Sequence, residues 1–344
     1  MLGAIHSFSK FIRIEAQSPA TARWYIDRLQ RLADYLVDER NPPELGYLRC
    51  VDLRPFHVQE WLESMPAMRP TTRRNYIQAI KRCLAWCVEM GHLDKSPIAG
   101  MRRPGAGRRE IVISGEEFAR IQRCVPNRDF RDLLDFAWAT GARAKECVEL
   151  ERRHVQLDES RIVFPVGEDK MRKAPRIIYL DDAAKAIVAR RLDQCDRRVF
   201  TNSNGEPWTP RSVNCAFIQV RIRMGKAVLG KDGMQIPEKD VSDLIRRLNP
   251  LRHSNGKAVR KSQAELLDEA RRKLRNRLAS QHAPKYCLTL LRHSWCHHAL
   301  RRGIDALTVS ILMGHSDSSM VARVYGKLSH ATDYLREAAK KATR

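Results

Sequence analysis

The sequence has no long hydrophobic run. None of its apolar stretches approaches the roughly 18 to 20 residues that a helix needs to cross a bilayer. The opening residues, MLGAIHSFSKF, are too short and too polar for a secretory signal peptide. These absences argue against a membrane-spanning or exported protein. We therefore expect a cytoplasmic protein with no membrane partner.

The sequence also lacks the cysteine pattern of a cross-linked or metal-bound fold. Its nine cysteines are odd in number and scattered, and no two of them form a CxxC pair. This excludes a disulfide framework and the usual zinc-ribbon and thioredoxin spacings. A GxxxxGK[ST] phosphate-binding loop is absent as well. We expect reduced, mostly buried thiols and no cofactor.

Acidic residues are few relative to basic ones. The chain has 344 residues, with 40 Asp and Glu against 63 Lys and Arg, which gives a formal net charge of +23. Such an excess raises affinity for a phosphate backbone by displacing its counterions, so a polyanionic partner is expected. Apolar residues make up 43% of the chain and charged residues 30%, as in globular proteins. The length predicts two domains.

Apolar periodicity predicts a helical first domain over residues 1–100. Ser18 and Pro19 offer an N-cap and a first-turn proline, and residues 71–90 repeat apolar side chains at helical spacing before Gly91. With shorter apolar patterns at 8–14 and 58–62, this favours a unit of four or five helices.

A linker rich in Pro, Gly and Arg follows at 101–110, where the periodicity stops. Its arginines can lie along a phosphate backbone or remain solvated, and they are Arg102, Arg103, Arg108 and Arg109.

The second predicted domain covers residues 111–344. Ser114 and Glu117 have the spacing of a capping box, and helices are expected over 130–139 and 144–150. Two β-rich runs at 161–164 and 176–180 flank a Lys-rich turn, which predicts a hairpin. The uneven, basic stretch at about 221–284 is treated as an insertion, with a clear helix only at 263–278. This stretch can supply extra DNA contacts or a surface for a partner, or it can be a passive insertion.

Cleavage of a phosphodiester without a metal requires a nucleophile, fixed cations and an acid for the leaving oxygen. Arginine suits the cationic role because its planar fork bonds two phosphate oxygens. Arg143 stands at a predicted helix start after Gly141, and Glu146 three residues later can support its guanidinium. Around it the chain resembles the first arginine box of the tyrosine recombinases, the phage-integrase family, in the segment Ala139-Thr140-Gly141-Ala142-Arg143-Ala144-Lys145-Glu146.

Two later motifs make this resemblance specific. Leu290-Leu291-Arg292-His293-Ser294-Trp295 is similar to the family's second arginine box, and Leu312-Met313-Gly314-His315-Ser316 is similar to its L-G-H-[ST] motif. Arg323-Val324-Tyr325-Gly326 resembles its nucleophile segment. The resemblance implies Arg143 and Arg292 as phosphate clamps, His315 as a phosphate contact and Tyr325 as the nucleophile.

The hairpin turn supplies the remaining residue of the family's catalytic set, a lysine. Lys170 resembles the family's leaving-group acid, and Lys173 is kept as the alternative because the spacing to the following strand differs by about one residue. Three residues before Arg292, the family's usual histidine is replaced by Thr289. Threonine can donate a hydrogen bond to phosphate, but it does not titrate near neutral pH.

The resemblance implies a mainly α-helical, two-domain clamp. A helical, SAM-like core-binding domain would join a catalytic domain that carries a small β-sheet. Cleavage would proceed through a 3′-phosphotyrosyl link without metal or ATP. Implied partners are double-stranded DNA, further copies in a homotetramer and accessory directionality factors, with the protein at the nucleoid.

Three alternatives remain at this stage. A type IB topoisomerase would use the same clamp to relax DNA, and a decayed integrase would bind DNA without cutting it. Cys287, His293, Cys296, His297 and His298 raise a zinc site as a third possibility, against which the resemblance assigns structural positions to His293, Ser294 and Cys296.

Overall fold

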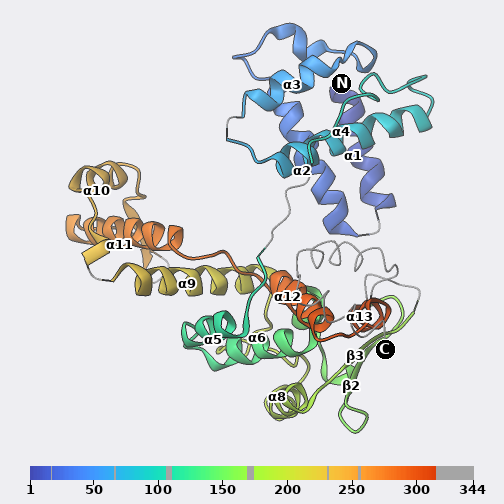
Figure 1. Cartoon of the computed structure of the whole chain (residues 1–344). Coiled ribbons are helices and arrows are strands. Elements are labelled where there is room, and N and C mark those ends of the chain that lie inside the picture. Colours follow the sequence, from blue (N-terminus) through green and yellow to red (C-terminus); the bar gives the residue numbers. More distant parts are fainter. Residues whose placement is uncertain are drawn as a thin grey trace, which may run out of the picture. The chain divides into compact units, whose positions relative to one another are not determined.

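The computed structural model describes residues 1–16, 18–65, 67–105, 111–168, 174–230, 232–254 and 257–314. Contacts divide the chain into two units, Met1–Glu110 and Ile111–Arg344. Helices dominate both units, and the strands form two small sheets (Figure 1). The predicted fold class, mainly α with a small sheet in the second part, is confirmed.

All regular secondary structure in the described residues of the first unit is helical. Its elements are α1 (Leu2–Glu15), α2 (Pro19–Leu36), η1 (Pro43–Tyr47), η2 (Cys50–Asp52), α3 (Pro55–Glu63) and α4 (Pro70–Glu89). Ser18 caps α2 as predicted, since its Oγ accepts a hydrogen bond from the amide of Thr21 at 3.2 Å. Helices α1, α2 and α4 pack together around side chains that are almost fully buried, including Phe8, Leu29 and Leu84.

The second unit is built around α6. Its helices and strands are α5 (Gly115–Arg123), α6 (Arg128–Thr140), α7 (Ala144–Glu149), η3 (Arg152–His154), β1 (Val155–Gln156), β2 (Arg161–Phe164), β3 (Arg176–Tyr179), α8 (Asp182–Leu192), α9 (Pro210–Leu229), η4 (Asp232–Met234), α10 (Glu238–Ile245), β4 (Leu251–Ser254), β5 (Lys257–Arg260), α11 (Gln263–Gln281), α12 (Leu288–Arg301) and α13 (Ala306–Met313). Helices α8 and α12 pack on α6, whose Leu133 and Phe136 are buried in the main core of the unit.

The predicted hairpin is present as the pair β2 and β3. They are antiparallel, with Phe164 opposite Arg176 and Arg161 opposite Tyr179, and β1 adds a short third strand. The turn that carries the predicted lysines lies outside the described residues. The N-cap half of the predicted capping box is present, because Ser114 accepts a hydrogen bond from the amide of Glu117 at 3.1 Å. The side chain of Glu117 accepts a hydrogen bond from the hydroxyl of Tyr286.

Residues 210–281 form an arm made of α9, η4, α10, β4, β5 and α11, which extends to one side of α5, α6 and α12 (Figure 1). The sequence predicted an insertion that starts near residue 221, whereas the arm starts at Pro210. Helix α9 runs without a break from Pro210 to Leu229, so residue 221 lies in mid-helix. Thr209 caps α9 by accepting a hydrogen bond from the amide of Ser212 at 3.1 Å, and proline occupies the first turn. The sequence Thr209-Pro210 is itself a helix start signal, and it indicates a helix that begins before residue 221.

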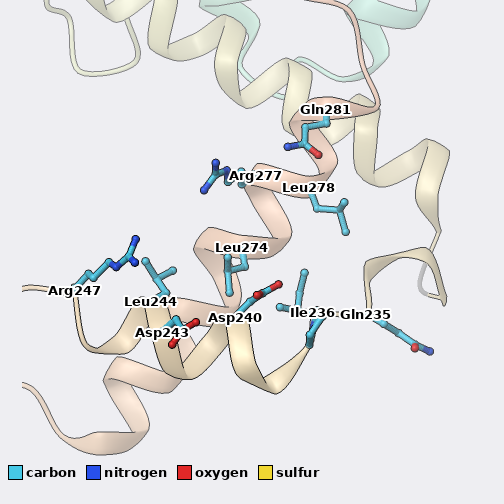
Figure 2. Close-up of a pocket in the computed structure, with 11 residues that line it drawn as sticks. Gln235, Ile236, Asp240, Asp243, Leu244, Arg247, Leu274, Arg277, Leu278 and Gln281 are labelled. Carbon is cyan, nitrogen blue, oxygen red and sulfur yellow. The ribbon is translucent and has the colours of Figure 1, made fainter. Parts of the chain in front are cut away.

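The outer part of the arm is held by apolar contacts between α10 and α11. Figure 2 shows Leu244 of α10 beside Leu274 of α11, at a cavity of about 460 Å³ that Ile236 and Leu278 also line. Helix α10 was not predicted, although Val241, Leu244 and Ile245 stand at the i, i+3 and i+4 spacing of an amphipathic helix.

Gly225 allows α9 and α11 to approach closely. A Cβ built at this position would overlap the backbone carbonyl of Ala279. The Gly225→Ala variant should therefore lose about 1 to 3 kcal/mol of unfolding free energy through overpacking. Thermal unfolding followed by circular dichroism measures this loss. Gly115→Ala is the matched control, because a Cβ at Gly115 meets no atom within 4 Å. Equal melting temperatures for Gly225→Ala and wild type would contradict the packing argument.

In the described part of the chain, no helix combines the length and the apolar character needed to span a bilayer. All nine cysteines are described, and no disulfide joins any two of them. Most are buried or half-buried, whereas Cys215 is exposed.

Candidate active site

Arg143 lies at a helix start that its own neighbours build. Helix α6 ends at Gly141, whose φ of 62° is the left-handed conformation that glycine adopts without strain. Arg143 then serves as the N-cap of α7. Glu146 accepts a hydrogen bond from the Arg143 amide at 2.7 Å and another from its guanidinium Nη1 at 2.7 Å. The predicted support of Arg143 by Glu146 is thus present in the geometry.

Arg292 approaches the same place from α12. Its Nη1 donates to the carbonyl of Gly141 at 2.8 Å, and its Nη2 donates to the carbonyl of Met313 at 2.6 Å. Only 6% of the residue is exposed. Burial, and secondly the nearby positive charge of Arg143, lower the pKa of Arg292 to about 10, which still leaves it protonated at neutral pH.

The two arginines converge on one turn. Arg143 Nη2 donates to the carbonyl of Gly314, the residue after the Met313 carbonyl that Arg292 holds. Gly314 caps α13 with a φ of 62°, the left-handed conformation that glycine adopts without strain. His315 follows directly in the sequence and lies outside the described residues. The guanidinium groups therefore fix the backbone from which the His315 segment begins.

A third arginine, Arg176, completes the cluster. It begins β3, and its Nε donates to Glu146 at 3.2 Å while its Nη1 donates to the carbonyl of Leu312 at 2.8 Å. The side chains of Arg176 and Glu146 are each only 3% exposed. Sequence reasoning missed Arg176. The available signal was its alternation with Ile178, which places both residues on the buried face of β3.

The cluster has little free space. A Cβ at Gly141 would lie 2.7 Å from the ring of Trp295, and a Cβ at Gly314 would lie 2.7 Å from Cδ of Arg176. Trp295 in turn donates its indole N–H to the carbonyl of Ala139 at 2.8 Å. Both turns that carry the arginine contacts are therefore fixed by sterics as well as by hydrogen bonds.

The charge of this cluster suits an anion. Three guanidinium groups surround one carboxylate, that of Glu146, so a net positive charge remains. Arg143 is the most exposed of the three, with 20% of its side chain accessible against 3% for Arg176. A phosphate would reach Arg143 first, since buried Arg176 acts on the protein side of the cluster.

The other predicted site residues fall into two groups. Arg102 and Arg103 are exposed at the end of the first unit, where Arg103 donates to the side chain of Gln78. The remaining predicted residues lie outside the described part of the chain, and they are Arg108, Arg109, Lys170, Lys173, His315 and Tyr325.

Thr289 is exposed in the first turn of α12, one helical turn before Arg292. Its hydroxyl does not titrate near neutral pH, as a histidine would. We therefore expect Thr289→Ala to cleave DNA at a rate within about tenfold of wild type, since an exposed hydroxyl bond contributes about 0.5 to 1.5 kcal/mol at most. Single-turnover cleavage measures this rate. An inactive Thr289→Ala variant would contradict the expectation and show that the hydroxyl contacts the phosphate.

The residues raised as a zinc site do not gather around a point. Cys296 is buried in an apolar cluster with Leu300 and Met313. Ser294 accepts a hydrogen bond from the amide of Ile113 at 2.9 Å. Within the described ranges, no group of three or more His, Cys, Asp or Glu side chains is placed to hold a metal ion.

The chain is similar to known proteins in sequence and in fold. No protein-family model matches the chain. Over 206 residues the chain is 27% identical to a tyrosine recombinase XerC of Xanthomonas axonopodis pv. citri (strain 306), a match that spans 57% of this chain and 65% of the relative.

Solved structures show the same fold at low sequence identity. The chain is similar to the Tn1549 transposon integrase in complex with transposon right end DNA, with a TM-score of 0.66, 14% identity and 99% of both chains covered. It is also similar to a lambda integrase tetramer bound to a Holliday junction, with a TM-score of 0.60 and 12% identity. That match covers 93% of this chain and 76% of the other.

Proposed function

We propose that this chain is a member of the tyrosine recombinase family, a site-specific recombinase that cuts and rejoins DNA strands through a 3′-phosphotyrosyl intermediate. Integration or recombination of a DNA element is the process it would serve. The observation that carries the proposal is the pair of arginines, Arg143 and Arg292, held on successive carbonyls of Met313 and Gly314.

Each proposed residue has a distinct task. Tyr325 attacks the scissile phosphate and releases a 5′ hydroxyl. Arg143 and Arg292, with His315, stabilise the charge on the phosphorane, because fixed donors stabilise developing charge without reorganisation. Lys170, or Lys173 in its place, protonates the leaving oxygen. Glu146 and Arg176 position Arg143.

The second half of the reaction reverses the first on a different strand. The 5′ hydroxyl of a partner duplex attacks the phosphotyrosyl link, and Tyr325 leaves. One phosphoester bond forms as one breaks in each step, so the reaction needs no ATP. The arginines, the histidine and the lysine supply the charge stabilisation and the proton, so it needs no metal either.

The proposed partners follow from the same chemistry. Double-stranded DNA with a recombination or attachment site is the substrate, and a homotetramer on two duplexes brings four tyrosines to four strands. Similarity to a lambda integrase tetramer on a Holliday junction supports this assembly. Accessory directionality factors are further proposed partners. The proposed location of the protein is the nucleoid in the cytoplasm.

A suicide substrate tests the function. In a duplex nicked just 3′ of the cleavage site, the short fragment that carries the 5′ hydroxyl dissociates after cleavage, so the covalent complex accumulates. We expect a protein–DNA adduct that survives denaturation, and strand exchange when a second duplex is added. Absence of any adduct would favour a protein that only binds DNA. Relaxation of supercoils without strand exchange would favour a type IB topoisomerase instead.

A further inference from the structure

The tip of the arm concentrates positive charge. Between Asp243 and Glu265 the chain has six Lys and Arg residues and no Asp or Glu. Five of these cations are exposed, and we call them the basic ribbon: Arg246, Arg247, Arg252, Lys257 and Arg260. They lie at the end of α10 and along the hairpin of β4 and β5.

The hairpin carries cations on both of its faces. Strands β4 and β5 are antiparallel, with Arg252 opposite Val259 and Leu251 opposite Arg260. Because opposed residues share a face and successive residues alternate, Arg252 lies with Lys257 on one face and Arg260 lies on the other. Leu251 and Val259 are 44% and 40% exposed, so neither face is covered by the rest of the second unit.

The base of the hairpin is anchored although its strands are uncovered. Lys261, directly after β5, forms an ion pair with Glu269 of α11 at 2.8 Å and donates to the carbonyl of Asn249 at 2.9 Å. Its backbone amide donates to the carbonyl of Pro250 at 2.8 Å. An isolated two-stranded hairpin is only marginally stable in water, and these contacts fix this one to the arm.

Neighbouring acids neutralise only part of the charge. Arg252 pairs with Glu265 at 3.3 Å and Arg246 with Asp243 at 3.5 Å, in exposed pairs that contribute little stability. In the described part of the chain, the other three cations of the basic ribbon form no ion pair: Arg247, Lys257 and Arg260. The surplus charge is thus available to a polyanion.

We propose that the basic ribbon is a second contact surface for duplex DNA, separate from the arginine cluster at Arg143. A two-stranded ribbon fits the major groove, which is about 12 Å wide. The groove has phosphates along both walls, and cations on both faces of the hairpin match that arrangement. The choice of DNA as the polyanion rests on the proposed function. The contact adds affinity and does not take part in cleavage.

The test uses the full chain and an intact duplex, so that binding is measured apart from catalysis. The variant replaces Arg252, Lys257 and Arg260 by alanine. Each lost phosphate contact should lower the slope of log affinity against log salt by about 0.9, so the triple variant should lose about 2 to 3 in slope and about tenfold in affinity. Fluorescence anisotropy over a range of salt concentrations measures both.

A charge-preserving variant serves as the matched control. Arg252→Lys, Lys257→Arg and Arg260→Lys together keep every charge, so the salt slope should stay at the wild-type value. Equal slopes and affinities for the alanine variant and wild type would overturn the proposal. So would a loss confined to single-stranded RNA of the same length. If the ribbon variant weakens binding while wild type forms no phosphotyrosyl adduct, the proposed function fails and the DNA contact stands.

Discussion

The Tyr325→Phe variant should form no covalent adduct with a suicide substrate, while wild type accumulates one. Phenylalanine keeps the ring and removes only the oxygen that we propose attacks phosphorus, so DNA binding should be retained. Without a nucleophile, cleavage falls to the uncatalysed rate, which is below detection. Denaturing gel electrophoresis of the reaction measures the adduct, and anisotropy measures the retained binding.

Tyr179→Phe is the matched control for this result. Tyr179 ends β3 in the same unit and is 54% exposed, so it is a tyrosine at the surface outside the proposed nucleophile segment. This control should form the adduct at the wild-type rate. An adduct with the Tyr325→Phe protein would assign the nucleophile to another residue. The loss of adduct in both variants would point to a general effect of removing tyrosine hydroxyls.

Arg292→Lys should lower the cleavage rate by about 10² to 10³, the usual cost of losing one fixed donor to a transition state. The two guanidinium nitrogens hold the carbonyls of Gly141 and Met313. A lysine ammonium is a single point and cannot reach both, so the turns before Arg143 and His315 lose a common support. Single-turnover cleavage at saturating protein measures the rate.

A buried arginine outside the cluster separates catalysis from stability. Arg191 is 3% exposed and donates to Asp129 at 2.5 Å and to the carbonyl of Thr201 at 3.0 Å. Arg191→Lys should lower the melting temperature through unsatisfied buried groups, as Arg292→Lys also should. It should leave the cleavage rate nearly unchanged. Equal loss of rate in both variants would contradict a specific role for Arg292.

Much of the local structure could be predicted, because short-range chemistry determines it. Ser18 and Ser114 cap helices through their own side chains, and Gly141 and Gly314 end helices where a positive φ is required. The contact of Arg143 with Glu146 is equally local, since it closes within one helical turn. The roles of Tyr325, His315 and Lys170 remain predictions.

Features that depend on distant partners escaped the sequence. From the sequence alone, Arg176 is a polar residue at the end of a predicted strand. Only the fold brings Glu146 and Leu312 into contact with it. Helix α9 packs on α11 with Gly225 against Ala279, a contact that no periodicity within either segment reveals. The exposed hairpin of β4 and β5 has no buried face, so the usual alternation of apolar and polar residues is missing.

The arginine cluster is assembled from four segments, with Arg143 and Arg176 early in the second unit and Arg292 and Gly314 late. During synthesis, the early arginines emerge from the ribosome long before α12 and α13 exist to receive them. An unfinished chain therefore has no complete arginine cluster. Under the proposed function, strand cleavage would become possible only after α12 has packed on α6 and α13 has packed on β3.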